Sequence, residues 1–363
     1  MARPFELVSL NMRMSTEKDK KTLTPYDHTK LSNINTCPTW GIIRYSLHKT
    51  TGGANREMPL EAGAAAHDAF AAMNWWYAAR YGTDHIEDRD LVWNEGKRIF
   101  SEDRLITMRD THSDTATDRT NLINFSLEAL NTSGFYDDPS DRNRTIANIS
   151  EGIITFCDRY DPNRYRIWHN SSTIGIECVF DAVVTIVYKR SSMRSGIATE
   201  EKDIRITGKL DGLKHNIKQN RLEIHEYKTG SRLDSAWLSQ WIMSHQITGY
   251  CAAATLFTNE DCNHAEVIGM QIPIGKNPMG GIVQESVARN PLKYEKWAEW
   301  LVHTVNIEET YRNYVFDAPR YTNSCNRYFR ACSMLPFCDA EDREDQEAVL
   351  ENMTIAEWSP LDD

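Results

Sequence analysis

The sequence predicts an α/β domain with a helical insertion, and the order of its segments carries this prediction. The chain has 363 residues, of which 40% are hydrophobic, and this is enough to bury a substantial core. Helix-forming residues dominate the first half, whereas β-branched runs typical of strands occur in the second half. We therefore expect helices first, then a mostly antiparallel sheet with a crossover helix, and finally a helix and a cysteine-bearing tail.

The first half begins with a polar stretch and then becomes helical. Its strongest helical segment is the Ala-rich MPLEAGAAAHDAFAAMNWWYAARY, and polar loops such as DTHSDTATD separate later helices. The expected elements are a polar lead-in over residues 1–30, a helix within 31–50, a helix over 58–81, helices within 83–142 and a helix over 143–160.

The second half alternates strand-like runs with two helical segments. The expected strands cover 174–188, 204–213, 221–228 and 265–274, and the expected helices cover 235–257 and 292–314.

The charge is unevenly distributed along the chain. The net charge is −11, but residues 339–363 contain ten acidic residues and only one basic residue, Arg343, which gives this segment −9. Residues 1–338 are therefore nearly neutral, and the last 25 residues form an acidic tail. This balance neither supports nor excludes a nucleic-acid partner.

Composition and short motifs exclude several classes of function. The sequence has no run of about 18 apolar residues and no apolar signal core near its start, so we expect no membrane association and a cytoplasmic location. Eight cysteines spread over a long chain do not indicate a disulfide framework. There is no GxxxxGK[ST] motif of a nucleotide-driven motor, and no helix-turn-helix or zinc-finger pattern.

The stretch LEIHEYKTG places charged side chains on the apolar face of a strand. Leu222 and Ile224 share this face with Glu226 and Lys228 because side chains alternate with period two. The polar turn KHNIKQN joins this strand to the preceding one and sets Asp211 opposite residue 225 or 226, with opposed Cβ atoms about 4.5–5.5 Å apart. Two carboxylates this close suit a divalent Mg²⁺ or Mn²⁺ ion. The alternative is an ordinary solvated pair of Glu226 and Lys228.

Three motifs together resemble the PD-(D/E)XK nuclease superfamily, in particular its RecB-like branch of CRISPR-associated and phage exonucleases. The motifs are GKLDG, EIHEYKTG and SHQITGY, and they lie within residues 174–275. The resemblance implies a restriction-endonuclease-like core, in which a mixed sheet is flanked by helices, with a helical insertion and a C-terminal cysteine staple. One departure is that Asp211 is not preceded by proline.

The resemblance also implies roles for individual residues. Asp211 and Glu226 would bind the metal, Tyr227 would belong to the same metal site, and Lys228 would act in catalysis. In LEAGAAAHDAF, His67 would be a further metal ligand, one helical turn after Gly63. The alternative for His67 is a surface or core histidine without a ligand.

A helix after the catalytic strand resembles the family's Gln and Tyr element. Gln246 and Tyr250 would position the substrate phosphate, with Gln240 as a rival for the glutamine and His245 as a further candidate. The alternative is an amphipathic helix that packs its tyrosine and exposes its glutamine.

Two further features of the sequence each allow two interpretations. Glu177 in IECVF matches a supporting glutamate of the family, or it is a charge at a strand edge. Trp75, Trp76 and Tyr77 could stack on the bases of a single strand, or they could pack a helix against a core.

Four cysteines resemble the iron–sulfur element of the same branch. Cys37 lies in NTCPTW, and Cys325, Cys332 and Cys338 follow in SCNRYFRACSMLPFCD with intervals of six and five residues, which departs from the commoner spacing. The resemblance implies that they hold a [4Fe–4S] cluster and tie distant parts of the chain together. A Cys₄ zinc site and ordinary buried cysteines remain alternatives. The other cysteines, expected to be plain thiols, are Cys157, Cys178, Cys251 and Cys262.

These observations predict a Mg²⁺- or Mn²⁺-dependent DNA exonuclease in a bacterial host cell, acting in phage recombination, DNA repair or CRISPR adaptation. Its partners would be DNA, single-stranded or with free ends, and recombination or adaptation proteins. The alternative is a non-catalytic nucleic-acid- or partner-binding protein that retains the fold. The expected organisation is a single nuclease domain over 1–363, with N-terminal helices at 31–82, the insertion at 83–160, the catalytic core at 174–275, a C-terminal helix and cysteine motif at 292–338 and the tail at 339–363.

Overall fold

The computed structural model describes residues 5–51, 58–81, 115–159, 164–170, 173–192, 196–272, 281–327, 330–356 and 358. The chain forms two compact units, which are described separately. The first unit contains Met1–Asn55, Phe180–Gly208 and Pro291–Asp363, and the second contains Arg56–Val179 and Lys209–Asn290. The expectation of a single nuclease domain stays a prediction.

The first unit begins with a strand that the sequence analysis missed. β1 (Phe5–Met14) pairs antiparallel with β5 (Ile176–Ser192), from Phe5 opposite Arg190 to Met14 opposite Ala182. The expectation of a polar lead-in was therefore wrong for residues 5–14. Their apolar residues partly alternate, as in an edge strand with one buried face, but the charged residues of the short helix α1 (Glu17–Thr22) dominate the composition of this region.

The expected helix within 31–50 is divided into α2 (His28–Thr36) and α3 (Pro38–Tyr45). Cys37 ends the first helix and precedes the second, with an extended backbone at φ −157° and ψ 105°. Proline disfavours a helical conformation in the residue before it, so Pro38 imposes the break. The break leaves Cys37 outside both helices.

The first unit has a small apolar core, which includes Ile42, Ile43, Val315, Met334 and Phe337. α11 (Pro291–Tyr311) contacts α2, α3 and β1. The shorter elements are β2 (Pro25–Tyr26), β3 (Lys49–Thr50), η2 (Val315–Asp317), η3 (Thr322–Ser324), β10 (Asn326–Arg327), β11 (Arg330–Ala331), α12 (Leu335–Asp339), α13 (Arg343–Glu351) and β12 (Thr354–Ile355).

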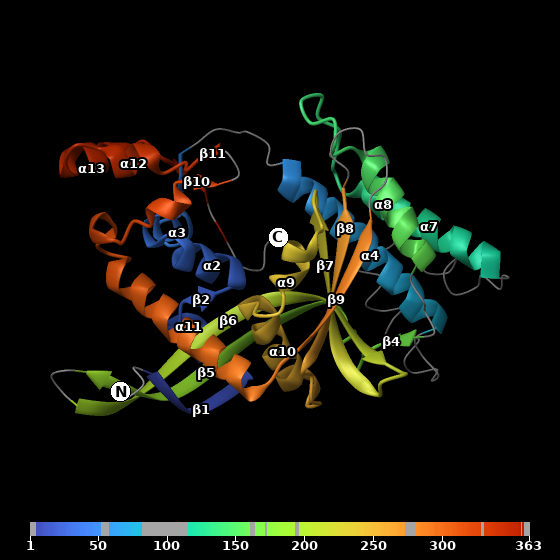
Figure 1. Cartoon of the computed structure of the whole chain (residues 1–363), viewed down its shortest axis with the longest axis horizontal. Coiled ribbons are helices and arrows are strands. Elements are labelled where there is room, and N and C mark those ends of the chain that lie inside the picture. The colour runs from blue at the N-terminus through green and yellow to red at the C-terminus, as the bar shows by residue number, and fades with distance from the viewer. Residues whose placement is uncertain are drawn as a thin grey trace. The chain divides into compact units, whose positions relative to one another are not determined.

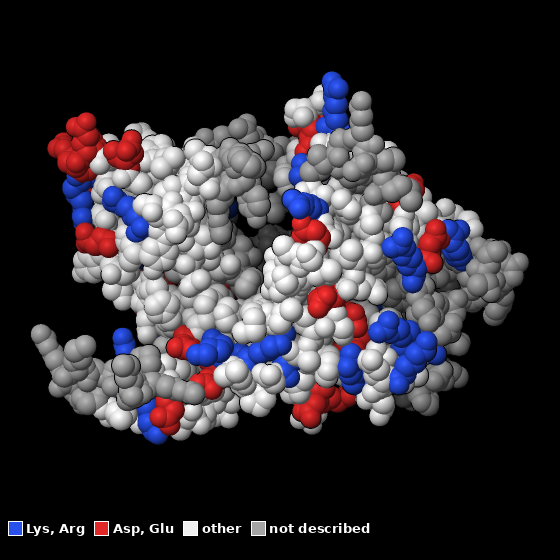
Figure 2. All heavy atoms as spheres, in the orientation of Figure 1, with Lys and Arg blue, Asp and Glu red and all other residues white. Residues whose placement is uncertain are grey.

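The acidic tail begins in this unit. Acidic side chains such as Glu344 and Asp345 on α13 are exposed, and red atoms gather over this helix in Figure 2. Within the described ranges, no helix is both long and apolar enough to cross a membrane.

The second unit is built on a mixed sheet flanked by helices (Figure 1). β6 (Gly196–Asn216) and β7 (Arg221–Gly230) form the expected antiparallel hairpin, and β7 pairs in parallel with β8 (His264–Gln271). A parallel neighbour requires a crossover, and α10 (His245–Thr258) supplies it. The single helix expected over 235–257 is divided, because α9 (Ser235–Ser239) and a turn precede α10. β8 pairs antiparallel with β9 (Ile282–Ala288), and β4 (Tyr165–Ile167) pairs with β6.

Helices of this unit pack against the sheet through a large apolar core. α4 (Met58–Tyr81) contacts β7, and α8 (Ile146–Arg159) contacts β8. The rings of Phe70 on α4 and Tyr227 on β7 stack with their centroids 4.6 Å apart, and Phe156 of α8 joins them. This core fixes α4 on the sheet and thereby sets the position of His67 relative to the residues of β7.

The helical insertion is described only in part. α7 (Thr115–Thr132) and α8 pack with α4 in the same core, while residues 83–114 lie outside the described residues. Trp75 and Trp76 are buried to 2% and 1% exposure, and Tyr77 is also buried. The base-stacking interpretation of these residues was therefore wrong, and they pack the helix against the core. Cys157, Cys178, Cys251 and Cys262 are buried free thiols.

Candidate active site

The candidate site lies where the β6–β7 hairpin meets α4 and α10. The last paired residues of the hairpin are Gly212 and His225, so Asp211 and Glu226 follow as the next opposed residues. This is the register expected from a turn centred near residue 218. Asn220 lies in this turn with φ +47°, a conformation that asparagine tolerates better than most residues.

Asp211 is fixed by two contacts from different elements. Its Oδ2 accepts a hydrogen bond of 2.8 Å from the backbone N–H of Tyr227, and its Oδ1 lies 3.5 Å from Nδ1 of His67. Burial would raise the pKa of Asp211, but the His67 ring, the Lys228 ammonium and the Tyr227 N–H hold it below its ordinary value. The Asp211 carboxylate is therefore kept charged inside the protein.

His67 reaches Asp211 because of its place on α4. A Cβ added at Gly63, one turn earlier, would lie 3.4 Å from Oγ1 of Thr229, which is an ordinary contact. Gly63 thus leaves room beside β7 without being strictly required there. Burial opposes the charged ring of His67, but the adjacent Asp211 raises its pKa above the ordinary value.

Glu226 is almost fully buried, at 1% exposure, and its two oxygens differ. Oε1 receives Nζ of Lys228 at 2.6 Å and Nε2 of Gln246 at 3.1 Å. Oε2 is buried and has no hydrogen-bond partner among the described residues. Burial first, and then the charge of Asp211, raises the pKa of Glu226 to about 7, while Lys228 acts in the opposite sense. A buried, unpaired carboxylate oxygen is costly unless a cation occupies its open side.

α10 brings two predicted residues to the site in one contact chain. Gln246 donates to Glu226 and also to the hydroxyl of Tyr250, at 3.1 Å. The rival Gln240 instead donates to the carbonyl of Trp237 in its own helix. Of the two glutamines, the structure therefore brings Gln246 to the carboxylates.

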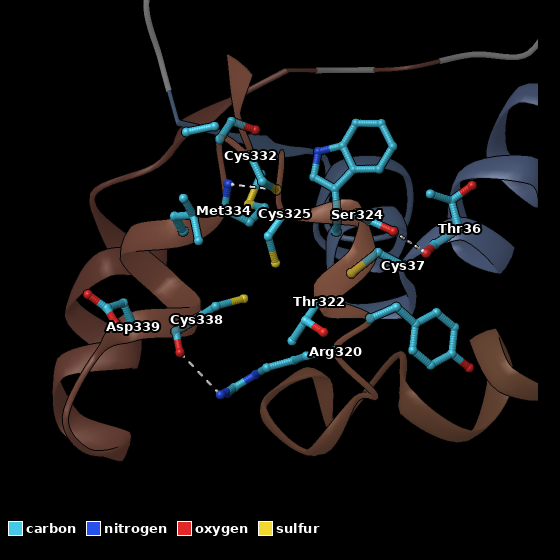
Figure 3. A pocket seen from close by; sticks show the side chains of 15 residues that line it. Thr36, Cys37, Arg320, Thr322, Ser324, Cys325, Cys332, Met334, Cys338 and Asp339 are labelled. Atoms are coloured by element: carbon cyan, nitrogen blue, oxygen red, sulfur yellow. Dashed lines mark hydrogen bonds between the residues drawn. The ribbon is translucent and has the colours of Figure 1, made fainter. Parts of the chain in front are cut away.

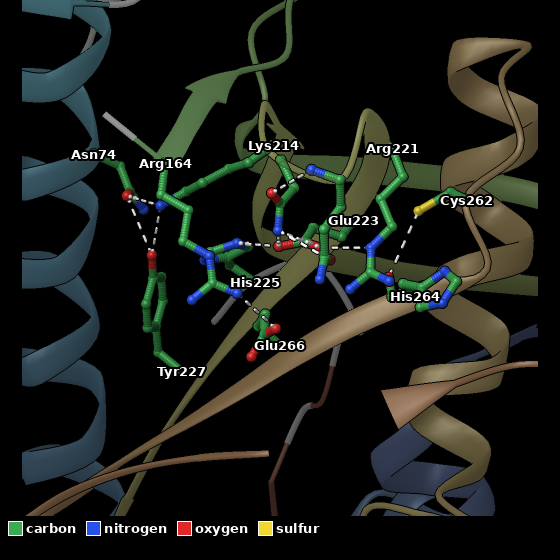
Figure 4. A network of polar contacts seen from close by, with 12 residues as sticks. Asn74, Arg164, Lys214, Arg221, Glu223, His225, Tyr227, Cys262, His264 and Glu266 are labelled. Atoms are coloured by element: carbon green, nitrogen blue, oxygen red, sulfur yellow. Dashed lines mark hydrogen bonds and ion pairs between the residues drawn. The ribbon is translucent and has the colours of Figure 1, made fainter. Parts of the chain in front are cut away.

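Tyr227 lies on the opposite face of β7, because side chains alternate along a strand. Its hydroxyl meets Oδ1 of Asn74 at 3.2 Å and Nζ of Lys214 at 3.0 Å (Figure 4). Lys214 is fully buried, and burial lowers its pKa well below the ordinary value. The Tyr227 side chain therefore does not enter the site. Its backbone N–H and C=O point to the same side of the strand, toward Asp211.

A third carboxylate completes the cluster. One ligand atom each of His67, Glu177 and Asp211 lies within 4.8 Å of the others, and such a set could hold a metal ion. Burial and the Asp211 charge raise the pKa of Glu177. Glu177 also has φ +50°, a backbone conformation that is unfavourable for a non-glycine residue.

Sequence reasoning missed Lys209, whose Nζ lies 2.8 Å from Oε2 of Glu177. The signal was present in GKLDG, since Lys209 stands two residues before Asp211 and therefore on the same strand face. The buried network of Lys214 and Asn74 was also missed. These two residues meet only because α4 packs against the sheet, and no local pattern indicates this.

The four predicted cluster cysteines lie around one cavity of the first unit. The cavity has a volume of about 360 Å³, and Cys37, Cys325, Cys332 and Cys338 are among its lining residues. The sulfurs of Cys37, Cys325 and Cys338 point toward its middle (Figure 3), and Sγ of Cys332 accepts a hydrogen bond from the Met334 N–H at 3.4 Å. All four are free thiols, so no covalent staple joins them.

The second unit has a mixed sheet flanked by helices, and carboxylates, a histidine and a lysine converge at one hairpin. This combination defines a class of α/β proteins that could bind a metal ion for hydrolysis. The comparison with protein families then identifies the group within this class. The model of the PD-(D/E)XK nuclease superfamily matches residues 148–339, more than half of the chain, and the protein belongs to that superfamily. Membership implies a nucleic-acid substrate. Neither the curated proteins nor the solved structures contain a match.

Proposed function

We propose that the protein is a metal-dependent DNA exonuclease of the RecB-like branch. The observation that carries the proposal is the unpartnered Oε2 of Glu226, buried beside the group of His67, Glu177 and Asp211. A carboxylate oxygen costs more to bury without a donor than a neutral polar atom does, and a bound cation would offset that cost. An oxygen-rich set with one imidazole fits a hard divalent ion, Mg²⁺ or Mn²⁺.

In this proposal Asp211, Glu226 and His67 hold the ion, and Glu177 supports it. Tyr227 would contribute its backbone carbonyl, because its side chain points away from the site. When bound, such an ion polarises the phosphate and lowers the pKa of a bound water.

The chain's own residues would do the remaining work. Lys228, held 2.6 Å from Glu226, carries a positive charge to the place where negative charge develops on the phosphate. Burial opposes this charge, but Glu226 and Asp211 raise the pKa of Lys228, so it stays protonated. Gln246 and Tyr250 would orient the phosphate, since their polar groups already meet at the edge of the site.

The preference for DNA ends rests on the family resemblance. We propose a role in phage recombination, DNA repair or CRISPR adaptation, in the cytoplasm of a bacterial host, beside recombination or adaptation proteins.

The test is digestion of end-labelled linear DNA and of the same DNA in circular form, single- and double-stranded, with Mn²⁺ or Mg²⁺. We expect degradation of the linear DNA and survival of the circle. Asp211→Ala should lose cleavage together with Mn²⁺ affinity, whereas Lys228→Ala should retain Mn²⁺ binding in calorimetry and lose on the order of a hundredfold in rate.

Lys218→Ala, in the exposed turn of the same hairpin, is the matched control and should behave as the parent protein. Cutting of the circle would make the protein an endonuclease. DNA binding without metal and without cleavage would instead favour a non-catalytic binding protein.

We further propose that the cysteine cavity holds a [4Fe–4S] cluster that ties distant parts of the chain together. Four thiols around one cavity provide the usual ligand set. A tetrahedral zinc site uses the same four ligands and is the alternative.

A further inference from the structure

The turn between α9 (Ser235–Ser239) and α10 exposes two large apolar side chains beside the candidate site. Ile242 and Met243 are 43% and 57% exposed. In the same segment Trp237 and Trp241 form a T-shaped pair with ring centroids 5.4 Å apart. Adjacent exposed Ile and Met side chains at the tip of a turn need an explanation, because neither contributes to the core.

Hydrogen bonds and close packing fix the conformation of this turn. The buried guanidinium of Arg289 donates hydrogen bonds to three of its carbonyls, those of Trp241 at 3.1 Å, Ile242 at 3.3 Å and Ser244 at 3.2 Å. Below the turn Trp237 packs closely on β8, where a Cβ at Gly269 would lie only 2.5 Å from its ring. The fold thus orders the two apolar side chains before any partner binds, which lowers the entropic cost of binding.

The position of the turn is tied to the catalytic residues by the chain itself. Ser244 caps the N-terminus of α10, and Gln246 at its second position donates to Glu226. Met243 and Gln246 are three positions apart, so their Cα atoms lie at most about 11 Å from each other. At roughly 3.4 Å per base step, the exposed side chains lie within several nucleotides of a phosphate bound at Glu226.

The surroundings are compatible with a polyanion. Residues 235–259 contain no Asp, Glu, Lys or Arg, although the chain carries a net charge of −11. The surface at the place of α9 is correspondingly white in Figure 2. These residues themselves carry no acidic side chain that would repel a nucleic-acid strand, and contact would be made through its bases rather than its phosphates.

We propose that Ile242 and Met243 form an apolar wedge that contacts the bases of the nucleic-acid strand next to the scissile phosphate and displaces them from their stack. Isoleucine and methionine are among the side chains that proteins insert between base steps. The inference rests on the proposed nuclease function and adds how the site engages the bases of its substrate.

The test uses the full chain, linear DNA with 2-aminopurine near one end, and Ca²⁺ in place of Mn²⁺ so that binding is measured without cleavage. Binding to the parent protein should raise 2-aminopurine fluorescence, because the base leaves its stack. The double variant Ile242→Ser/Met243→Ser should lose this rise and bind about tenfold more weakly. Both side chains are exposed, so the variant should unfold at the parent temperature.

Ile217→Ser is the matched control, since Ile217 is 46% exposed on the β6–β7 turn of the same unit. It should leave fluorescence and affinity unchanged. Parent-like fluorescence and affinity in the double variant would overturn the wedge, while Mn²⁺-dependent cleavage by the parent would leave the nuclease proposal standing. A parent protein that cleaves no DNA would overturn both. A change of oligomeric state in the double variant, with DNA binding intact, would show a self-interface and overturn the wedge.

Discussion

At the scale of single residues, the site is a balance between burial and charge. Burial opposes the charged forms of Asp211, Glu226 and Lys228. Neighbouring opposite charges offset this cost for Asp211 and Lys228, whereas the charge of Asp211 adds to it for Glu226. The pKa of Glu226 stays raised, and its Oε2 has no hydrogen-bond partner among the described residues. This oxygen is therefore the position at which a cation would complete the site. Perturbed carboxylates of this kind are typical of functional sites.

Two substitutions of Glu177 separate the role of its carboxylate from the strain of its backbone. At φ +50° a glycine is unstrained, whereas an alanine is strained as glutamate is. Glu177→Gly and Glu177→Ala both remove the carboxylate, so both should lower Mn²⁺ affinity several-fold in calorimetry. The glycine variant should nevertheless be more stable than the alanine variant by about 1 kcal/mol in urea unfolding.

Equal stability of these two variants would mean that the backbone at Glu177 is not strained. Unchanged Mn²⁺ affinity in both would remove Glu177 from the metal site, and its ion pair with Lys209 would then be purely structural.

At the scale of elements, close helix packing decides where the functional residues stand. α2 and α3 cross so closely that a Cβ at Gly41 would lie 2.6 Å from the backbone of Ile34. This crossing, enforced by Pro38, leaves Cys37 at the junction of the two helices. α4 packs less tightly beside Thr229, where the Gly63 position has room.

An alanine at Gly41 and an alanine at Gly63 should affect the stability of the protein differently. Gly41→Ala should destabilise the protein by about 1–3 kcal/mol, because backbone must move to admit the methyl group. Gly63→Ala should be neutral or stabilising by up to about 1 kcal/mol, since alanine is the better helix former and meets only an ordinary contact. Urea unfolding measures both, and a Gly63→Ala variant as unstable as Gly41→Ala would contradict the packing described here.

At the scale of the whole molecule, the carboxylate site and the cysteine cavity belong to different units of the chain. Protein purified without oxygen should be brown, with absorbance near about 400 nm from thiolate-bound iron. Alanine at Cys37, Cys325, Cys332 or Cys338 should bleach the protein and lower its stability.

Cys157→Ala is the control, because Cys157 is a buried core thiol of the other unit, and it should leave the colour and the iron content unchanged. Colourless protein with one equivalent of zinc and no iron would replace the cluster with a zinc site.

The sequence by itself determined the elements whose signals are local. The β6–β7 hairpin, its register and the convergence of Asp211 with Glu226 follow from period-two alternation and a polar turn. The crossover α10 follows from the strand pattern on either side of it. The proline after Cys37 also carried enough information to divide α2 from α3, although the expected helix ran through it.

Only the tertiary structure decided which side chains are exposed and which distant residues meet. Trp75 and Trp76 suggest a base-stacking pair in the sequence, yet segments distant in the sequence bury them, while Ile242 and Met243 remain exposed beside the site. His67 contacts Asp211, which lies 144 residues later in the sequence. Cys37 lines the same cavity as cysteines that follow it by almost 300 residues. Burial and long-range contact depend on what packs against a segment, and a segment's own sequence does not contain that information.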